Sequence, residues 1–158
     1  MRNPRRRQGV TLIEMLLVVG IISLMVGVTF PSVSAGVDSL RLSSACDAIA
    51  SFLNGALNRA ERRQEVMEVA VLKAERALTL RSSEPGFLRR LELPEGIAIV
   101  GVVPEVPLEP GQPRRILLYP SGTVPRFGIE VENRRGARRI VRVDPTTGVP
   151  EIERAGAR

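Results

Sequence analysis

Residues 5–14 read Arg-Arg-Arg-Gln-Gly-Val-Thr-Leu-Ile-Glu, and the chain stays apolar from there to Phe30. The segment 10–30 holds 21 residues, of which only Glu14 has an ionisable side chain. A helix of that length rises about 31 Å, which is enough to cross the hydrocarbon core of a bilayer. No other stretch of the sequence is comparably long and apolar. We therefore expect a single membrane-spanning helix at residues 10–30.

Basic residues occupy the side that precedes this segment. Arg2, Arg5, Arg6 and Arg7 lie before it, and residues 1–9 contain no acidic side chain. Positively charged flanks of a membrane helix stay in the cytoplasm. We therefore expect residues 1–9 to be cytoplasmic and the rest of the chain to lie across the membrane.

Glu14 is an ionisable residue inside the expected membrane helix. An ionised carboxylate inside a membrane helix costs on the order of a few kcal/mol, and such residues are usually functional. The cost falls when a cation reaches the carboxylate, but the segment contains no Lys, Arg or His. The cation must come from elsewhere, and one candidate is the α-amino group formed if the chain is cut just before the apolar run.

The stretch Gln8-Gly9-Val10-Thr11-Leu12-Ile13-Glu14 resembles the class III signal of type IV pilins and type II secretion pseudopilins. In that family a prepilin peptidase cuts after the glycine and methylates the new N-terminus. The glutamate then pairs with the N-terminal amine of a neighbouring subunit during filament assembly. The resemblance implies that Gly9 is the last leader residue, Val10 the methylated N-terminus and Glu14 the assembly carboxylate. Val10 stands where phenylalanine or methionine is usual.

The same resemblance implies where the protein works and with what. It implies a single-pass protein of the bacterial inner membrane, with a cytoplasmic leader and a periplasmic globular domain. Its partners would be other pilins or pseudopilins of the same filament, the prepilin peptidase and an inner-membrane assembly platform.

Two simpler interpretations account for part of this stretch. In the first, it is a secretory signal peptide cut near Val33, Ser34 and Ala35. The apolar core of such a peptide is roughly 7–15 residues long, shorter than this one. In the second, it is an ordinary membrane anchor in which Glu14 lies near the membrane interface.

Composition argues against an enzyme and against a bound cofactor or metal. The sequence has no histidine, and Cys46 is its only cysteine, which excludes a catalytic triad, a Cys/His pair and a histidine-based metal site. With Ala45 and Ala48 nearby, Cys46 is expected to be a small buried thiol. The net charge of +6 falls to about +2 without the leader. Lys73 is the only lysine, a bias that we attribute to genome base composition.

The apolar helix is expected to continue beyond the membrane. Pro31 removes a backbone hydrogen bond and crowds the preceding turn, so we expect a kink there. From Leu40 the pattern is amphipathic, with one apolar stripe at three- and four-residue steps, formed by Leu42, Ala45, Ile49, Phe52, Leu53, Ala56 and Ala60. A helix from about Val10 to about Arg63 follows from these two patterns.

The pattern of the remaining residues predicts β-strands. Residues 65–81 fit both strand and helix periodicity, and we favour two short strands joined through residues 73–76. Further strand-like segments, bounded by Pro, Gly and Asn turns, lie at 87–93, 97–103, 115–119, 127–132, 139–143 and 149–152. Residues 104–113 form a proline-rich loop.

We therefore expect an α+β fold in which one long helix packs on an antiparallel sheet, which resembles the lollipop shape of pilins. The expected parts are a basic leader at 1–9, a transmembrane and assembly helix at 10–30, its amphipathic continuation at 31–63 and a β-rich domain at 64–158. Residues 116–122 and 140–144, with Thr147-Gly148, resemble late strands and turns of H-type minor pseudopilins and FimT-like minor pilins.

The resemblance implies a structural subunit, either a minor pseudopilin of a type II secretion system or a FimT-like minor pilin. FimT-like pilins bind DNA through basic C-terminal residues, and the corresponding candidates here are Arg134, Arg135, Arg138 and Arg139. Acidic residues lie close to them in the sequence, and no aromatic residues are interleaved for base stacking. We therefore favour a solvated hairpin tip over a nucleic-acid site.

Overall fold

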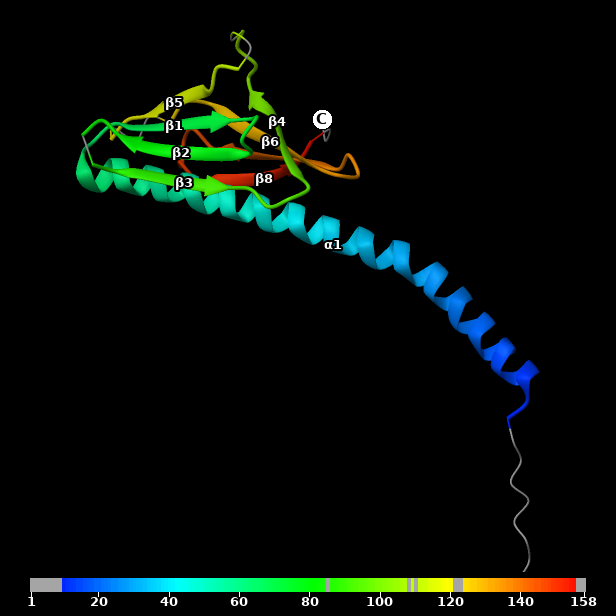
Figure 1. The fold of residues 1–158 in the computed structure, drawn as a ribbon. Helices are drawn as coiled ribbons and strands as arrows, with labels where there is room; N and C mark the ends of the chain where they lie inside the picture. Colours follow the sequence, from blue (N-terminus) through cyan, green and yellow to red (C-terminus); the bar gives the residue numbers. More distant parts are fainter. Residues whose placement is uncertain (1–9, 85, 108, 110, 121–123, 156–158) are drawn as a thin grey trace, which may run out of the picture. The chain divides into compact units, whose positions relative to one another are not determined.

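The computed structural model describes residues 10–84, 86–107, 109, 111–120 and 124–155, with the backbone alone at residues 30–33. It divides into two compact units, Met1–Val37 and Asp38–Arg158, and the long helix α1 (Leu12–Arg63) contributes to both. Figure 1 shows α1 followed by strands only (Figure 1). The strands are β1 (Met67–Leu72), β2 (Ala77–Ser82), β3 (Leu88–Glu92), β4 (Ile97–Val103), β5 (Arg114–Leu118), β6 (Phe127–Asn133), β7 (Arg138–Val143) and β8 (Pro150–Arg154).

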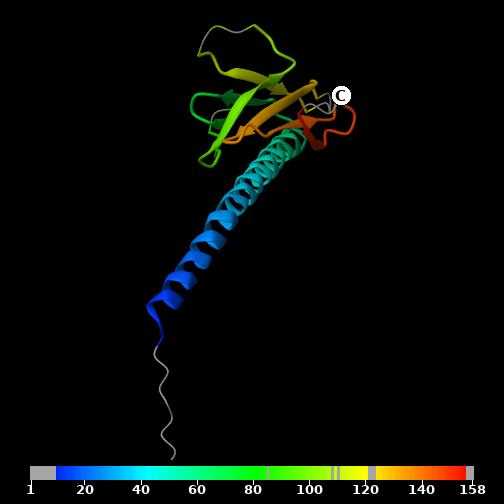
Figure 2. The ribbon, with the colours of Figure 1, turned by 90° about the vertical axis from the view of Figure 1, so that its right-hand side faces the viewer.

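The strands form two antiparallel sheets where we expected one. The first has the order β3-β2-β1-β5 and the second β4-β6-β7-β8. The chain leaves the first sheet after β3, enters the second with β4 and returns with β5. The connection from β4 to β5 is the proline-rich loop, which extends beyond the strands in both ribbon views (Figure 1, Figure 2). Prolines lack the N–H that a ladder requires, and the described residues of this segment pair with neither sheet.

The C-terminal part of α1 buries one stripe against both sheets. The seven residues of the predicted apolar stripe are all at most 2% exposed. They share one core with Val69, Val71 and Leu80 of the first sheet and with Ile129, Val131 and Val141 of the second. Burial of this stripe supplies the hydrophobic stabilisation on which most helices in folded proteins depend. The α+β class and the long helix are confirmed.

Residues 65–81 form strands, as we favoured. The α1 helix ends at Arg63 because Gln64 takes the left-handed conformation with φ of 56°, and the N–H of Glu65 bonds to the carbonyl of Ala60 at 3.3 Å. A left-handed residue just past the last helical turn is a common helix terminator. β1 and β2 then pair as a hairpin through residues 73–76. The helical alternative is excluded because Val69, Val71, Leu78 and Leu80 all face the core.

Cys46 is fully buried on α1, as the sequence predicts. Burial raises the pKa of its thiol to about 11, and the nearby Arg139 guanidinium opposes part of that rise. The thiol is therefore neutral and packs as a small apolar side chain.

Candidate functional site

The first turn of α1 contains the residues that the sequence singles out. Gly9 and the rest of the leader lie outside the described residues, which begin at Val10. Val10 and Thr11 precede the helix, and Glu14 lies in its first turn with its side chain exposed. The described chain therefore begins four residues before the carboxylate.

Thr11 caps this helix, a role that our reading of the sequence overlooked. Its side-chain oxygen accepts a hydrogen bond from the N–H of Glu14 at 3.3 Å. Its carbonyl accepts from the N–H groups of Glu14 and Met15, at 3.1 and 3.2 Å. Thr11 is thus the N-cap residue and Glu14 the third helical residue, the spacing of a capping box. The signal Thr-x-x-Glu was present in the sequence.

The cap places a negative charge where the helix favours one. The N-terminal N–H groups of a helix carry a partial positive charge, which stabilises an acidic side chain in the first turn. Glu14 thereby lies in the first turn of α1, four residues after Val10. This geometry brings a carboxylate and the start of the apolar segment together, so a cation on another chain could meet the carboxylate there.

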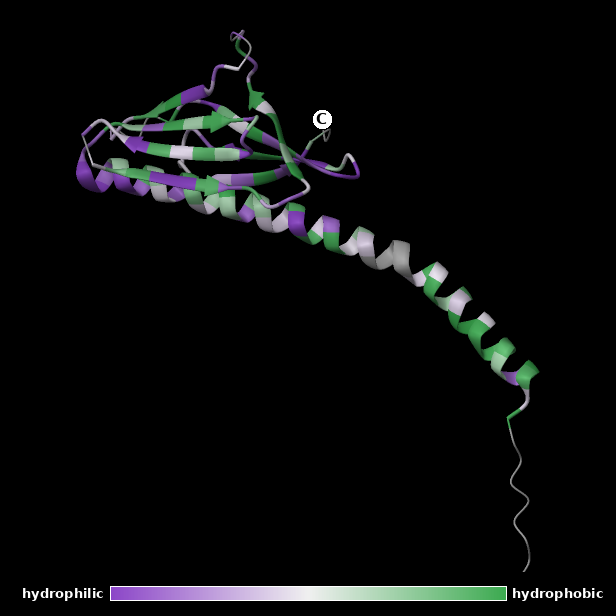
Figure 3. Ribbon diagram, in the orientation of Figure 1, coloured by the Kyte–Doolittle hydropathy of each residue, from purple (hydrophilic) through white to green (hydrophobic). Residues whose placement is uncertain are grey.

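The part of α1 on either side of Glu14 in the sequence exposes its apolar side chains. Leu12, Ile13, Leu16, Leu24 and Val28 are each at least 68% exposed, and this part of α1 is almost uniformly apolar in the hydropathy colouring (Figure 3). Among the described residues, α1 is the one helix long and apolar enough to cross a membrane. The hydroxyl of Thr29 donates to the carbonyl of Met25 at 2.8 Å, which satisfies this polar group without water.

Pro31 lies inside α1, whose helical assignment runs through it. Its side chain is outside the described residues, so the expected kink stays a prediction. The helix is described as continuous from Leu12 to Arg63, and its two parts belong to separate compact units.

The four C-terminal arginines lie on the β6–β7 hairpin, mostly in contact with other side chains of the chain. Arg135 forms an ion pair with Asp38 at 3.0 Å, and Arg138 pairs with Glu132 at 2.7 Å and Glu130 at 3.6 Å.

The two remaining arginines are held by packing and by a hydroxyl. Arg139 donates to the hydroxyl of Ser43 at 3.2 Å. The side chain of Arg134 packs over Gly96, where a Cβ would lie 2.8 Å from its Nε. Two of the four guanidinium groups are thus ion-paired and a third donates to a hydroxyl, which favours the solvated hairpin over a phosphate-binding surface.

The N-terminal segment matches a known sequence family. Residues 4–30 match the family model described as the prokaryotic N-terminal methylation motif. This match covers Arg5, Arg6 and Arg7, the residues Gly9 and Val10, Glu14 and the apolar run. No curated protein matches the chain.

The fold matches a solved pilin-like structure. The minor pseudopilin EpsH from the type 2 secretion system of Vibrio cholerae superposes with a TM-score of 0.55 at 14% sequence identity. The match covers 73% of this chain and 98% of that one. The chain is pilin-like in motif and in fold. At this identity the likeness concerns the fold alone.

Proposed function

We propose that this protein is a minor pseudopilin, a structural subunit of the inner-membrane-anchored pseudopilus of a type II secretion system. The observation that carries the proposal is the position of Glu14, the only ionisable side chain of the apolar segment 10–30, four residues after Val10. The methylation motif and the fold shared with a minor pseudopilin support it.

The proposed mechanism is polymerisation. A prepilin peptidase cuts between Gly9 and Val10 and methylates the amine of Val10. The apolar parts of α1 pack together in the filament core, where the Glu14 carboxylate of one subunit pairs with the Val10 amine of the next. A charge pair in an apolar surrounding is costly to break, so the pairing sets the axial position of each subunit. The leader stays cytoplasmic, the β-sheets face the periplasm and an inner-membrane platform drives assembly.

Mass spectrometry of the N-terminal peptide tests the first step of this mechanism. We expect a mature chain that begins at Val10 and carries one N-methyl group, because Gly9 precedes the apolar run. An intact start at Met1, or a start at Gly36 after a signal-peptide cut, would contradict the proposal. Replacement of Gly9 by Val provides the control, since it should leave the leader attached.

Purification from membranes tests the second step. The protein should co-purify with the other filament subunits of the same secretion system when the apparatus is expressed. Co-purification with the subunits of a type IV pilus instead would support the alternative, a FimT-like minor pilin. For that alternative, DNA binding by residues 37–158 should weaken steeply with salt and depend on Arg134 most, because Arg135 and Arg138 are already ion-paired.

A further inference from the structure

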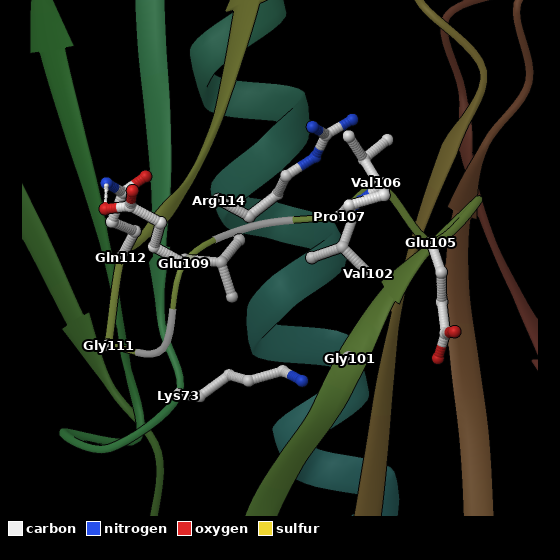
Figure 4. A pocket seen from close by; sticks show the side chains of 11 residues that line it. Lys73, Gly101, Val102, Glu105, Val106, Pro107, Glu109, Gly111, Gln112 and Arg114 are labelled. Atoms are coloured by element: carbon white, nitrogen blue, oxygen red, sulfur yellow. Dashed lines mark hydrogen bonds between the residues drawn. The ribbon is translucent and has the colours of Figure 1, made fainter.

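A cleft of about 580 Å³ opens between the two sheets of the Asp38–Arg158 unit. Its described lining comes from β1 and the turn after it, from β4, from β5 and from the loop that joins β4 to β5. Figure 4 shows Lys73 reaching across the cleft towards β4, and the guanidinium of Arg114 near Val106 and Pro107 (Figure 4). The cleft thus holds two cations on opposite sides of its opening.

Both cations are without an ion pair in the part of the chain that the structure describes. The acidic side chains that border the cleft turn elsewhere. Glu109 accepts a hydrogen bond from the side-chain amide of Gln112 at 2.8 Å, and the Glu105 carboxylate points away from the Arg114 guanidinium (Figure 4). The described side chains that line the cleft therefore leave both of its cations without an acidic partner.

The Lys73 side chain lies close to Gly101 of β4. A Cβ at Gly101 would lie 3.7 Å from the Lys73 ammonium nitrogen, so the ammonium rests close to the backbone of β4 with the cleft beside it. On the opposite side, the Nε of Arg114 is buried and has no hydrogen-bond partner among the described residues. A buried donor left unpaired costs free energy, and an anionic ligand that engages the guanidinium would offset that cost.

The floor of the cleft is apolar. Val71 and Val102 are buried there, while Val106 at the rim is 44% exposed. A ligand that suits this surface combines a carboxylate with an apolar stem, as a glutamate side chain does.

The strands at the cleft favour a protein segment as the source of that carboxylate. β4 and β5 are edge strands of their sheets, and every second residue of an edge strand turns its N–H and C=O away from its neighbour. An extended segment can pair with such an edge while a side chain enters a neighbouring pocket.

We propose that this cleft receives an acidic side chain of a neighbouring filament subunit, which pairs with Lys73 and Arg114. The proposal rests on the proposed function, because a pseudopilus supplies the neighbouring subunit. It gives the β-sheets a docking surface distinct from the helix contacts made by Glu14.

The single lysine of the chain makes a specific test available. A water-soluble carbodiimide joins an amine to a carboxylate only where the two are in contact, with loss of water to the carbodiimide. Apart from the N-terminus, Lys73 is the only amine of this protein. We expect treatment of membranes that contain the assembled filament to link Lys73 to an Asp or Glu of another subunit, identified by mass spectrometry.

Four variants separate the roles of charge, reactivity and position. Lys73→Arg should abolish the cross-link and keep co-purification, because the charge remains. Lys73→Gln and Arg114→Gln should each reduce co-purification on the order of tenfold, the effect of losing a charge-assisted hydrogen bond. Arg115→Gln is the matched control, since Arg115 faces the other side of β5 and lies 3.7 Å from Glu68. The Arg115→Gln variant should keep both the Lys73 cross-link and the co-purification at wild-type levels.

The outcomes separate this inference from the proposed function. If the protein co-purifies with the filament but Lys73 links only to Glu105 or Glu109 of its own chain, or to nothing, the cleft inference is wrong and the proposed function stands. If phosphate or acetate alone shields Lys73 from an amine reagent in the absence of other subunits, the cleft binds free anions and the docking inference is wrong. Failure to co-purify at all contradicts the proposed function and this inference with it.

Discussion

At the residue scale, Glu14 has two distinguishable properties, its charge and its place in the first turn of α1. Glu14→Ala should leave membrane insertion and leader cleavage intact, because the peptidase reads mainly the Gly9–Val10 junction and alanine lowers the cost of burial. Incorporation into the filament should fall by about thirtyfold, since removal of one member of a buried charge pair costs about 2 kcal/mol or more. Co-purification with the other subunits measures it.

Glu14→Gln distinguishes charge from size. Glutamine has nearly the same shape and still forms hydrogen bonds, but it cannot form an ion pair. If charge pairing drives docking, Gln should be nearly as defective as Ala. Ser23→Ala is the control, because it removes a polar group from the same apolar part of α1. Wild-type incorporation of both Glu14 variants would mean that Glu14 is only a tolerated interfacial residue.

Cys46 predicts a dependence of stability on alkaline pH. Burial raises its pKa from an ordinary value of 9.0 to about 11, so the folded domain holds the proton longer than the unfolded chain does. The stabilisation is complete below pH 9 and is lost as the pH rises through about 11, by at most about 2–3 kcal/mol. Urea unfolding of residues 37–158 at pH 8 and pH 11 measures it.

Cys46→Ala is the reference for that measurement. The variant shares every other titrating group with the natural domain, including Tyr119 and the arginines, but lacks the thiol. Its loss of stability between the two pH values should be smaller than that of the natural domain. Equal losses would show that Cys46 ionises with an ordinary pKa in the fold.

At the scale of elements, Asn133 joins the β6–β7 hairpin to α1. It is 7% exposed, and its side-chain oxygen accepts from the N–H groups of Arg135 and Ala137, both at 3.0 Å. Its side-chain amide approaches the carbonyl of Asp38 at 3.5 Å. The turn contains Gly136 at φ of 79°. The Asn133 side chain thus adds two hydrogen bonds to the two that the backbone forms there, from Asn133 N–H to the carbonyl of Ala137 and from Gly136 N–H to the carbonyl of Asn133.

Asn133→Ala should destabilise the domain by about 1–3 kcal/mol, because two turn amides lose their acceptor in a partly buried place. Asn133→Asp keeps an acceptor oxygen and should lose less. Thermal unfolding followed by circular dichroism measures both. Asn54→Ala, on the exposed face of α1, is the control and should change stability little. If it destabilised the domain as much as Asn133→Ala, the loss could not be assigned to the turn hydrogen bonds of Asn133.

At the scale of the whole molecule, the Asp38–Arg158 unit should fold without the N-terminal segment. The buried stripe of α1 begins at Leu42, and the core draws on α1 and both sheets from that residue onward. A version that begins near Val37 should be an α+β monomer, because the residues it lacks contribute nothing to this core. Circular dichroism and sedimentation measure it, and an unfolded or aggregated chain would contradict the boundary.

Much of this architecture is readable from the sequence because the deciding signals are local. The apolar run, the stripe from Leu42 to Ala60 and the alternation of β6 and β7 each lie within one segment, so periodicity alone identifies them. The leader, the Gly9–Val10 junction and Glu14 are equally local. Thr11 was missed as a cap although its spacing to Glu14 is a recognised helix-start signal.

Other features are decided only by tertiary contacts. The division of the strands into two sheets depends on β4 pairing with β6, about thirty residues away, and turn residues do not encode such pairing. The ion pairs of Arg135 and Arg138, which argue against a phosphate site, include Asp38, a residue 97 positions away in the sequence. The fold places Lys73 beside Gly101 and lines the same cleft with Arg114. The sequence by itself determined the apolar helix, the methylation motif and the kinds of element, because short-range pattern specifies them. Only the fold decided which distant charged side chains meet, because that depends on strand order and packing.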